Sequence, residues 1–107
     1  MMLTIEVRAK MGKINELYQT LLAFVPTMRK EKGCRNCRVS PDIVNEGVFR
    51  LSSDWDATGD FEKYIRSDVG SALFGAIELL AGSARVQTSS DANWEGIEAL
   101  KRMRNEI

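Results

Sequence analysis

Hydrophobic and polar residues alternate at the start of the chain. Over residues 2–9, one side of the backbone carries the apolar residues Leu3, Ile5, Val7 and Ala9, and the other side carries polar ones. This period of two predicts a half-buried strand. After Gly12 the period changes, and apolar residues recur at helical spacing up to about Lys30. The pattern therefore predicts a strand and then a helix, with a bend at Pro26 because proline lacks the N–H of one helical hydrogen bond.

Two more strand patterns predict a hairpin. Residues 34–39 and 48–55 are separated by Asn45-Glu46-Gly47, which has the composition of a turn. Pro41 favours an edge position for the first of these strands, since proline has no N–H to donate to a neighbouring strand. On the second strand, one face is predicted to carry Phe49, Leu51, Ser53 and Trp55.

The second half of the chain predicts three helices and a fourth strand. The first helix carries Phe61, Tyr64 and Ile65 on one face and breaks at Ser67-Asp68; the next is expected to stop at a left-handed cap on Gly82. A short strand over 84–88 and a linker at Ser89-Ser90-Asp91 follow. Helical spacing then predicts a final helix with a stripe formed by Trp94, Ile97, Leu100 and Met103.

This order of elements, β-α-β-β-α-β, is the ferredoxin-like split βαβ arrangement of an α+β fold. It predicts a four-stranded antiparallel sheet in a domain over residues 1–88, with a C-terminal helical extension over 89–107. Two main helices cover only one face of such a sheet. The uncovered face would carry both signs of charge, from Glu6, Arg8, Asn36, Arg38, Arg50, Ser52, Asp54, Arg85 and Gln87. Alternation leaves two interpretations open: a solvated surface, or a two-fold dimer in which two such faces pack together. Under either one, this face is not the ligand pocket.

Composition narrows the classes of function. The chain has 107 residues, and 15 basic residues balance 15 acidic ones, so neither nucleic acid nor a membrane surface is an expected partner. Glu6 and Arg8 interrupt the only segment where an apolar leader could lie, and two cysteines are too few for a disulfide scaffold. We therefore expect a cytoplasmic protein. Histidine is absent, which removes the commonest acid/base group and the commonest metal ligand.

The Cys34-Arg35-Asn36-Cys37 segment raises the question of a redox or metal site. It lies at the start of a predicted strand, where a spacing of three points two side chains to opposite faces. There is no second cysteine pair and no histidine to complete a zinc site. We therefore expect two small, buried or half-buried residues and no metal, with Cys37 able to reach a neighbouring pocket.

The stretch from Trp55 to Phe74 predicts a pocket between sheet and helices. A tryptophan closes a strand, and the next helix presents aromatic side chains three residues apart, which can enclose a flat apolar ligand. Trp55 and Tyr64 are the candidate catalytic residues. Core packing is the alternative role for each of them, and also for the candidate lining residues Val7, Cys37, Phe49, Leu51, Phe61, Leu73 and Phe74.

Three segments resemble one known family. They are MLTIEVRAKMGK at the start, VPTMRKEKGC from Val25 to Cys34, and W-x5-F-x2-Y-x2-S from Trp55 to Ser67. In this order they are similar to the antibiotic biosynthesis monooxygenase family, over about residues 2–88. The resemblance implies a dimeric α+β barrel, in which the sheets of a homodimer pack together and each subunit has a pocket between helices and sheet. It also implies cofactor-free oxygenation of a phenol, quinol or anthrone by molecular oxygen.

The resemblance assigns roles residue by residue. Trp55 matches the family's pocket tryptophan, and Phe61 matches a core position beside it. Tyr64 falls where many members have histidine, and Val7 falls where the haem-degrading branch has asparagine, so haem cleavage is disfavoured. As a base, Tyr64 would need its pKa lowered from about 10 by positive charge, and only Arg66 is close in sequence.

Two hypotheses follow. The first is a cofactor-independent monooxygenase of a small aromatic, quinol or anthrone-like compound, with Trp55 and Tyr64 in its site. The second is a non-catalytic dimeric protein on the same fold that binds a hydrophobic metabolite. An open pocket with Tyr64 pointing inward would favour the enzyme, whereas a pocket filled by Leu73 and Phe74 would argue against it.

Overall fold

The computed structural model describes residues 1–89 and 92–105, so the expected linker at Ser89-Ser90-Asp91 lies partly outside the described residues. The described elements run in the order β1 (Met2–Ala9), α1 (Ile14–Arg29), β2 (Cys34–Pro41), β3 (Val48–Trp55), α2 (Thr58–Arg66), α3 (Asp68–Leu80), β4 (Ala81–Gln87), β5 (Glu95–Gly96) and α4 (Glu98–Met103). The predicted β-α-β-β-α-β order is confirmed, with one short strand added.

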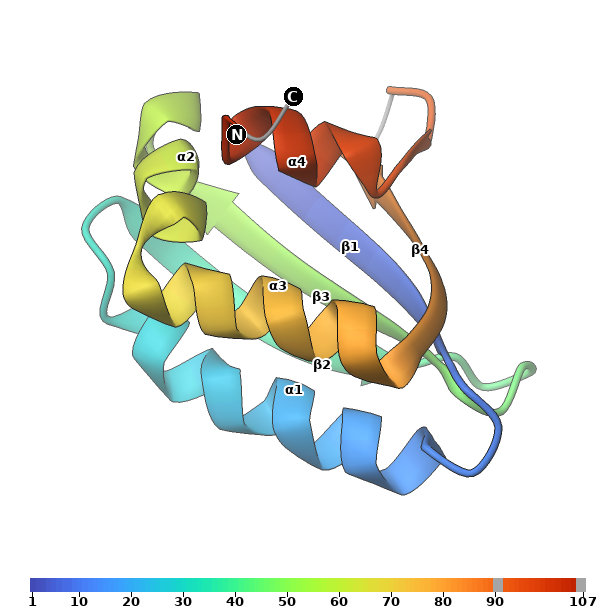
Figure 1. Cartoon of the computed structure of the whole chain (residues 1–107). Coiled ribbons are helices and arrows are strands. Elements are labelled where there is room, and N and C mark those ends of the chain that lie inside the picture. The colour runs from blue at the N-terminus through green and yellow to red at the C-terminus, as the bar shows by residue number, and fades with distance from the viewer. Residues whose placement is uncertain (90–91, 106–107) are drawn as a thin grey trace.

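The strands form a single antiparallel sheet in the order β2-β3-β1-β4-β5 (Figure 1). β1 is central, with Ile5 opposite Leu51 of β3 on one side and opposite Val86 of β4 on the other. β2 lies at the edge, as Pro41 predicted. The two-residue β5, which the sequence pattern did not predict, pairs with β4 and makes the sheet five-stranded rather than four-stranded.

The helices cover one face of this sheet. Figure 1 shows α1 and α3 side by side across that face, with α2 near the end of β3 and α4 beside it. The alternation predicted for β1 is confirmed, because its inward side chains are buried beneath the helices: Leu3, Ile5 and Val7. α1 contributes a stripe at helical spacing, made of Leu17, Leu21, Val25 and Met28. Burying a side chain of this size stabilises the fold by roughly 1.5–3 kcal/mol.

Ser67 joins α2 to α3. Its backbone N–H donates to the carbonyl of Tyr64 at 3.0 Å, which ends α2, and its hydroxyl accepts from the N–H of Gly70 at 3.1 Å, which starts α3. The predicted break at Ser67-Asp68 is therefore confirmed, with serine acting as an N-cap. A side chain at Gly70 would collide with the backbone of Tyr64 and Ile65, so the start of α3 packs directly on the last turn of α2.

Two expectations for the C-terminal part were wrong. α3 ends at Leu80, and Ala81 passes directly into β4 in extended conformation, so Gly82 is a strand residue and not a left-handed cap. Trp94 precedes β5 instead of opening the last helix, because residues 95–96 pair with the edge of β4. α4 therefore begins only at Glu98. The guanidinium carbon of Arg85 lies over the ring of Trp94, 4.1 Å from the ring centroid.

Two arginines fix α4 against α2 and α3. Arg66 donates to the carbonyl of Met103 at 2.6 Å. Arg104 donates to the carbonyl of Ile65 at 2.5 Å and to the hydroxyl of Ser71 at 3.0 Å. These bonds connect the C-terminal segment to the helix that carries Tyr64.

The expectation that Cys34 and Cys37 point to opposite faces was also wrong. The pairing of β2 with β3 shifts between Cys34 and Asn36, which leaves Arg35 as an extra residue in a β-bulge. Cys34 is consequently opposite Trp55, and Cys37 is opposite Ser53. Since Trp55 and Ser53 are two residues apart and share the helix-covered face, the two cysteines share it as well. The side-chain oxygen of Asn36 accepts the N–H of Cys37 at 2.9 Å, which satisfies a donor within the irregular segment.

Candidate functional site

Three aromatic side chains meet where β3 ends. Trp55 is the last residue of β3, and α2 brings Phe61 and Tyr64 against it from the buried side of the helix. The ring centroid of Trp55 lies 5.5 Å from that of Phe61 and 5.8 Å from that of Tyr64. All three residues are at most 2% exposed. The structure thus brings together the two predicted catalytic residues and one predicted lining residue.

A hydrogen bond sets the position of the Trp55 ring. Its indole N–H donates to the hydroxyl of Ser53 at 2.8 Å, and Ser53 is a buried polar residue on the same face of β3. Buried indole N–H groups normally have such a partner. The sequence analysis placed Ser53 on this face but assigned it no role. The spacing Ser-x-Trp on one strand was the available signal, because residues two apart on a strand are neighbours.

The hydroxyl of Tyr64 is buried and has no hydrogen-bond partner among the described residues. Leaving such a group unpaired costs roughly 1–3 kcal/mol. Burial raises the pKa of Tyr64, and the neighbouring acidic groups of Cys37, Glu31 and Cys34 add to this rise. Tyr64 therefore stays protonated at neutral pH, where it can donate a hydrogen bond but cannot act as a base.

Arg66, the cation that could have lowered the pKa of Tyr64, instead forms hydrogen bonds with the C-terminal segment. It donates to the carbonyl of Met103 and to the side-chain oxygen of Asn105. The sequence placed Arg66 two positions from Tyr64, but residues two apart on a helix point in different directions.

Two cysteine thiols lie close to this aromatic cluster. The sulfur of Cys37, which is 0% exposed, is 3.3 Å from the sulfur of Met28 on α1. Burial raises the pKa of Cys37 to about 12. Electrostatic interaction with Cys34 also raises this pKa, whereas the positive charge of Arg29 lowers it. Burial also raises the pKa of the partly exposed Cys34. Both thiols are therefore neutral in the free protein.

The remaining predicted site residues do not form one pocket. Phe49 is opposite Val7, at the other end of β3 from Trp55. Six residues at about 3.4 Å each separate Phe49 from Trp55 by roughly 20 Å. Leu51 of β3 is buried, as are Leu73 and Phe74 of α3, and all three belong to the hydrophobic core. The burial of Leu73 and Phe74 therefore argues against the enzyme hypothesis, whereas the buried, unpartnered hydroxyl of Tyr64 favours it.

A groove lies at the far end of the sheet, beside Phe49. Tyr18 of α1 stacks on Phe49 with ring centroids 5.0 Å apart. The groove has a volume of about 410 Å³ and is lined by Ile14, Asn15, Tyr18, Pro41, Asp42, Glu46, Gly47, Val48 and Phe49. Sequence analysis placed Tyr18 in the helical stripe but did not name it as a site residue, since its contact with Phe49 depends on how α1 packs on the sheet.

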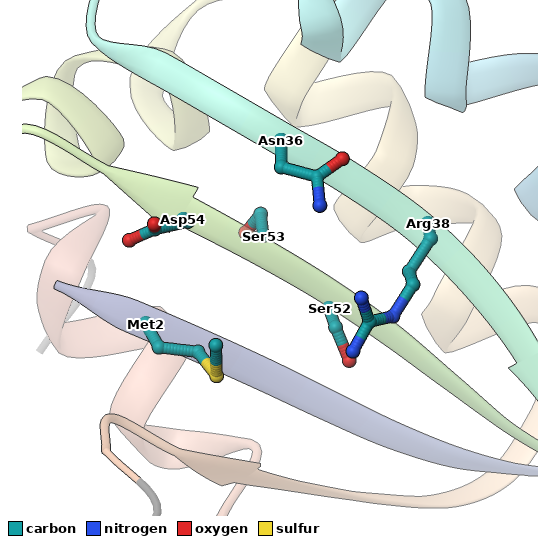
Figure 2. Close-up of a pocket in the computed structure, with 6 residues that line it drawn as sticks. All are labelled: Met2, Asn36, Arg38, Ser52, Ser53 and Asp54. Atoms are coloured by element: carbon teal, nitrogen blue, oxygen red, sulfur yellow. The ribbon is translucent and has the colours of Figure 1, made fainter.

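The open face of the sheet has hollows as well. Figure 2 shows one of them, where the side chain of Arg38 reaches from β2 over Ser52 of β3. Its volume of about 20 Å³ has room for a water molecule but not for an aromatic ring. A second hollow of about 410 Å³ lies over Glu6, Arg8, Ser83, Ala84 and Arg85. Neither lining includes Trp55, Phe61 or Tyr64.

Charged side chains on this face pair within the chain. Glu6 accepts hydrogen bonds from Arg85 at 2.8 and 3.2 Å, and its second oxygen lies 3.0 Å from Arg50. Arg50 also pairs with Asp42 at 3.2 Å.

Within residues 1–89 and 92–105, no three cysteine or acidic side chains gather closely enough to hold a metal ion. In the same ranges, none of the helices has the length and apolar character needed to span a bilayer.

Fold and site together define a class: ferredoxin-like α+β proteins with an aromatic cluster between the helices and one face of the sheet. Within this class, the chain belongs to the antibiotic biosynthesis monooxygenase family, whose sequence profile matches residues 1–72. No curated protein sequence gives a significant match.

Solved structures share the fold at low sequence identity. A Shewanella oneidensis protein superposes with a TM-score of 0.76 at 17% identity, covering 88% of each chain. A Deinococcus radiodurans protein, provisionally named an antibiotic biosynthesis monooxygenase, gives a TM-score of 0.73 at 21% identity and covers 90% of this chain and 100% of its own. Another antibiotic biosynthesis monooxygenase gives 0.74 at 16% identity, covering 87% of this chain and 100% of its own. At these identities the similarity supports the fold alone.

Proposed function

We propose that the protein is a cofactor-independent monooxygenase of a small aromatic, quinol or anthrone-like compound. The observation that carries this proposal is the buried Tyr64 hydroxyl, which has no partner among the described residues and lies beside Trp55 and Phe61. A hydroxyl that is costly to leave unpaired gains a partner when a substrate oxygen occupies the site. Family membership supplies the class of reaction.

Tyr64 acts as a hydrogen-bond donor in this scheme. A hydrogen bond to an ionised oxygen is roughly twice as strong as one to a neutral oxygen, so the Tyr64 hydroxyl favours the substrate anion over the neutral substrate. The proton goes to solvent, because the raised pKa of Tyr64 rules it out as the base. Trp55 and Phe61 hold the flat ring system.

The electron-rich anion then reduces molecular oxygen by one electron. Superoxide and the substrate radical combine to give a peroxide, and loss of water leaves a carbonyl. For an anthrone, a CH₂ group and O₂ become a C=O group and water, so the electrons balance without a cofactor. Because Trp55, Phe61 and Tyr64 are packed closed, this proposal requires α2 to move away from β3 to admit the substrate.

The proposed assembly is a homodimer in which two open sheet faces pack together. Such a contact must be complementary to itself, and this face carries both signs of charge. Arg38 is the most useful probe, since it makes no hydrogen bond or ion pair within the described part of the chain, whereas Arg50 is paired with Glu6 and Asp42. Arg38→Glu should shift the protein towards monomer in sedimentation velocity, and an unchanged dimer would refute this arrangement.

The test of activity is oxygen uptake by metal-free protein over a panel of quinols, anthrones and catechols. We expect consumption above the non-enzymatic rate, and a loss of at least about tenfold in Tyr64→Phe, the rate equivalent of a 1.4 kcal/mol hydrogen bond. Tyr18→Phe is the matched control, because it removes the same atom at the other end of the sheet. Equal rates for Tyr64→Phe and wild type would contradict the role of Tyr64.

A second candidate function is binding without catalysis, and the groove beside Phe49 supports it. Its volume of about 410 Å³ lies within the range of small-molecule sites, and the Tyr18–Phe49 stack offers an aromatic wall. Under this hypothesis, hydrophobic ligands should raise the melting temperature of wild type but not of Tyr18→Ala, while no oxygen is consumed.

A further inference from the structure

A hollow of about 410 Å³ lies on the open face of the sheet where β1 pairs with β4, and it is lined by Glu6, Arg8, Ser83, Ala84 and Arg85. Arg8 is directly opposite Ser83 in this pairing, and Glu6 is directly opposite Arg85. Diagonal neighbours such as Arg8 and Arg85 are about 7–8 Å apart, which is within reach of long side chains. Two arginines and one serine hydroxyl therefore border one cavity, the β1–β4 hollow.

Arg85 is held in place from two sides. Its Nε and Nη2 donate to the two oxygens of Glu6 at 2.8 and 3.2 Å, and its guanidinium carbon lies 4.1 Å from the centroid of the Trp94 ring. Its Nη1 has no hydrogen-bond partner within residues 1–89 and 92–105. A guanidinium that is already fixed loses little freedom when it binds a ligand, which lowers the cost of binding.

Arg8 and Ser83 carry polar groups without a partner. Both side chains are exposed, and neither makes a hydrogen bond or ion pair in the part of the chain that the structure describes. We propose that they form, together with Nη1 of Arg85, a binding site for a small organic anion that presents a carboxylate or phosphate group. A planar guanidinium offers parallel N–H donors that match the oxygens of both groups, and a serine hydroxyl can donate a further bond. The volume of the β1–β4 hollow lies within the range of small-molecule sites, so it has room for more than the anionic group.

The charge around the β1–β4 hollow favours an anion over a cation. Glu6 is the one acidic residue in its lining. Burial opposes the ionisation of Glu6, but the positive charges of Arg85 and Arg50 outweigh this effect and lower its pKa. The ionised carboxylate contacts both arginines, and Arg50 also pairs with Asp42. Two acidic groups thus offset two arginines, and Arg8 remains as one positive charge that an anion would balance.

The site is complete within one protomer and does not depend on the proposed oxygenase activity. In the proposed homodimer, the open faces would pack together, and Arg8 would lie between two sheets as a charge without a partner, which is costly. A bound anion would offset that cost. This consequence, unlike the site itself, rests on the proposed homodimer.

NMR titration of the full-length protein with inorganic phosphate and, separately, with benzoate tests the site, near neutral pH and with the ionic strength held constant by NaCl. We expect saturable shifts of the backbone amides that line the β1–β4 hollow. Arg8→Gln should weaken binding by at least about tenfold, the scale of one hydrogen bond to a charged group, and Ser83→Ala by roughly threefold. Arg38→Gln should leave binding unchanged. It is the matched control, because Arg38 is an exposed arginine on the same face, without a hydrogen bond or ion pair in the described ranges, and lies outside the lining.

Saturation by either anion, lost in Arg8→Gln and kept in Arg38→Gln, would support the site, and a preference for phosphate or benzoate would identify the group that it recognises. Absence of saturable shifts with both anions would overturn the proposal. Equal weakening by Arg8→Gln and Arg38→Gln would also overturn it, because it would indicate general attraction to positive charge. Binding by a protein that sediments as a monomer would refute the proposed homodimer and leave the anion site supported. The substituted side chains are all exposed, so the fold should be retained, as the dispersion of each NMR spectrum will check.

Discussion

The indole N–H of Trp55 donates a 2.8 Å hydrogen bond to the hydroxyl of Ser53, two residues earlier on the same face of β3. Ser53→Ala would leave this buried donor unpaired, so we expect the free energy of unfolding to fall by about 1–3 kcal/mol in urea titrations. Ser52→Ala, on the opposite face, should change it by less than about 0.5 kcal/mol. Equal losses in the two variants would show that the Trp55 hydrogen bond does not contribute.

Tyr64→Phe should separate stability from function. The substitution removes a buried hydroxyl that has no partner in the described structure, so the free energy of unfolding should stay level or rise by about 1 kcal/mol. Oxygen uptake, in contrast, should fall under the proposed mechanism. A marked loss of stability in thermal unfolding would mean that the hydroxyl has a partner in the free protein, which would remove the main support for a substrate contact there.

Two glycines of α3 should respond in opposite directions to alanine. A Cβ at Gly70 would meet the backbone of Tyr64 and Ile65, whereas a Cβ at Gly75 would meet nothing within 4 Å. Gly70→Ala should therefore destabilise the protein by several kcal/mol, on the order of 3 or more. Gly75→Ala should stabilise it by about 0.5–1 kcal/mol, the difference in helix propensity. Comparable effects would contradict the close approach of α3 to α2.

Asp42 should give the β2–β3 loop a pH dependence. One of its carboxylate oxygens accepts the N–H groups of Val44 and Asn45 at 2.8 and 3.1 Å, and the other pairs with Arg50. The two backbone N–H groups, with Arg50 adding to them, lower the pKa of Asp42 from 3.8 to about 2. A folded-state pKa below the unfolded value means stability that is present above pH 3.8 and is lost as the pH falls towards 2.

Asp42→Asn tests this dependence, because asparagine keeps an acceptor oxygen and cannot titrate. The stability gap between wild type and the variant should be largest near neutral pH and should shrink in acid, as measured by urea unfolding at a series of pH values. A gap that stays constant through this range would show that these bonds do not stabilise the carboxylate in solution.

Alternation and helical spacing were sufficient to predict most of the fold. Leu3, Ile5 and Val7 are buried as the period of two required, and the Ser67 break falls where two helices meet. The failures came from contacts between distant segments. Glu95 and Gly96 form a strand because they pair with the edge of β4. A local sequence pattern does not reveal which strand edge is available for pairing. Gly82 looked like a helix cap, but the chain passes from α3 into β4 without a left-handed residue.

The arrangement of the candidate site residues was predicted in part for the same reasons, while their roles stay a prediction. Trp55, Phe61 and Tyr64 are close in sequence, so strand and helix periodicity sufficed to bring them together. Phe49 was grouped with them because it shares a face of β3 with Trp55, although strand length puts it at the opposite end. The partner of Trp55 and the missing partner of Tyr64 depend on atomic positions that periodicity does not describe.

The bulge at Arg35 determines whether two cysteines at a given spacing lie on the same face of the sheet or on opposite faces. With the bulge, cysteines three apart point together; in a regular strand, only cysteines two apart do so. A relative lacking the extra residue would therefore reproduce the same sulfur geometry with a Cys-x-Cys spacing, and a relative with Cys-x2-Cys but no bulge would not. Relatives should accordingly be compared by the pairing of β2 with β3 and not by the number of residues between the two cysteines.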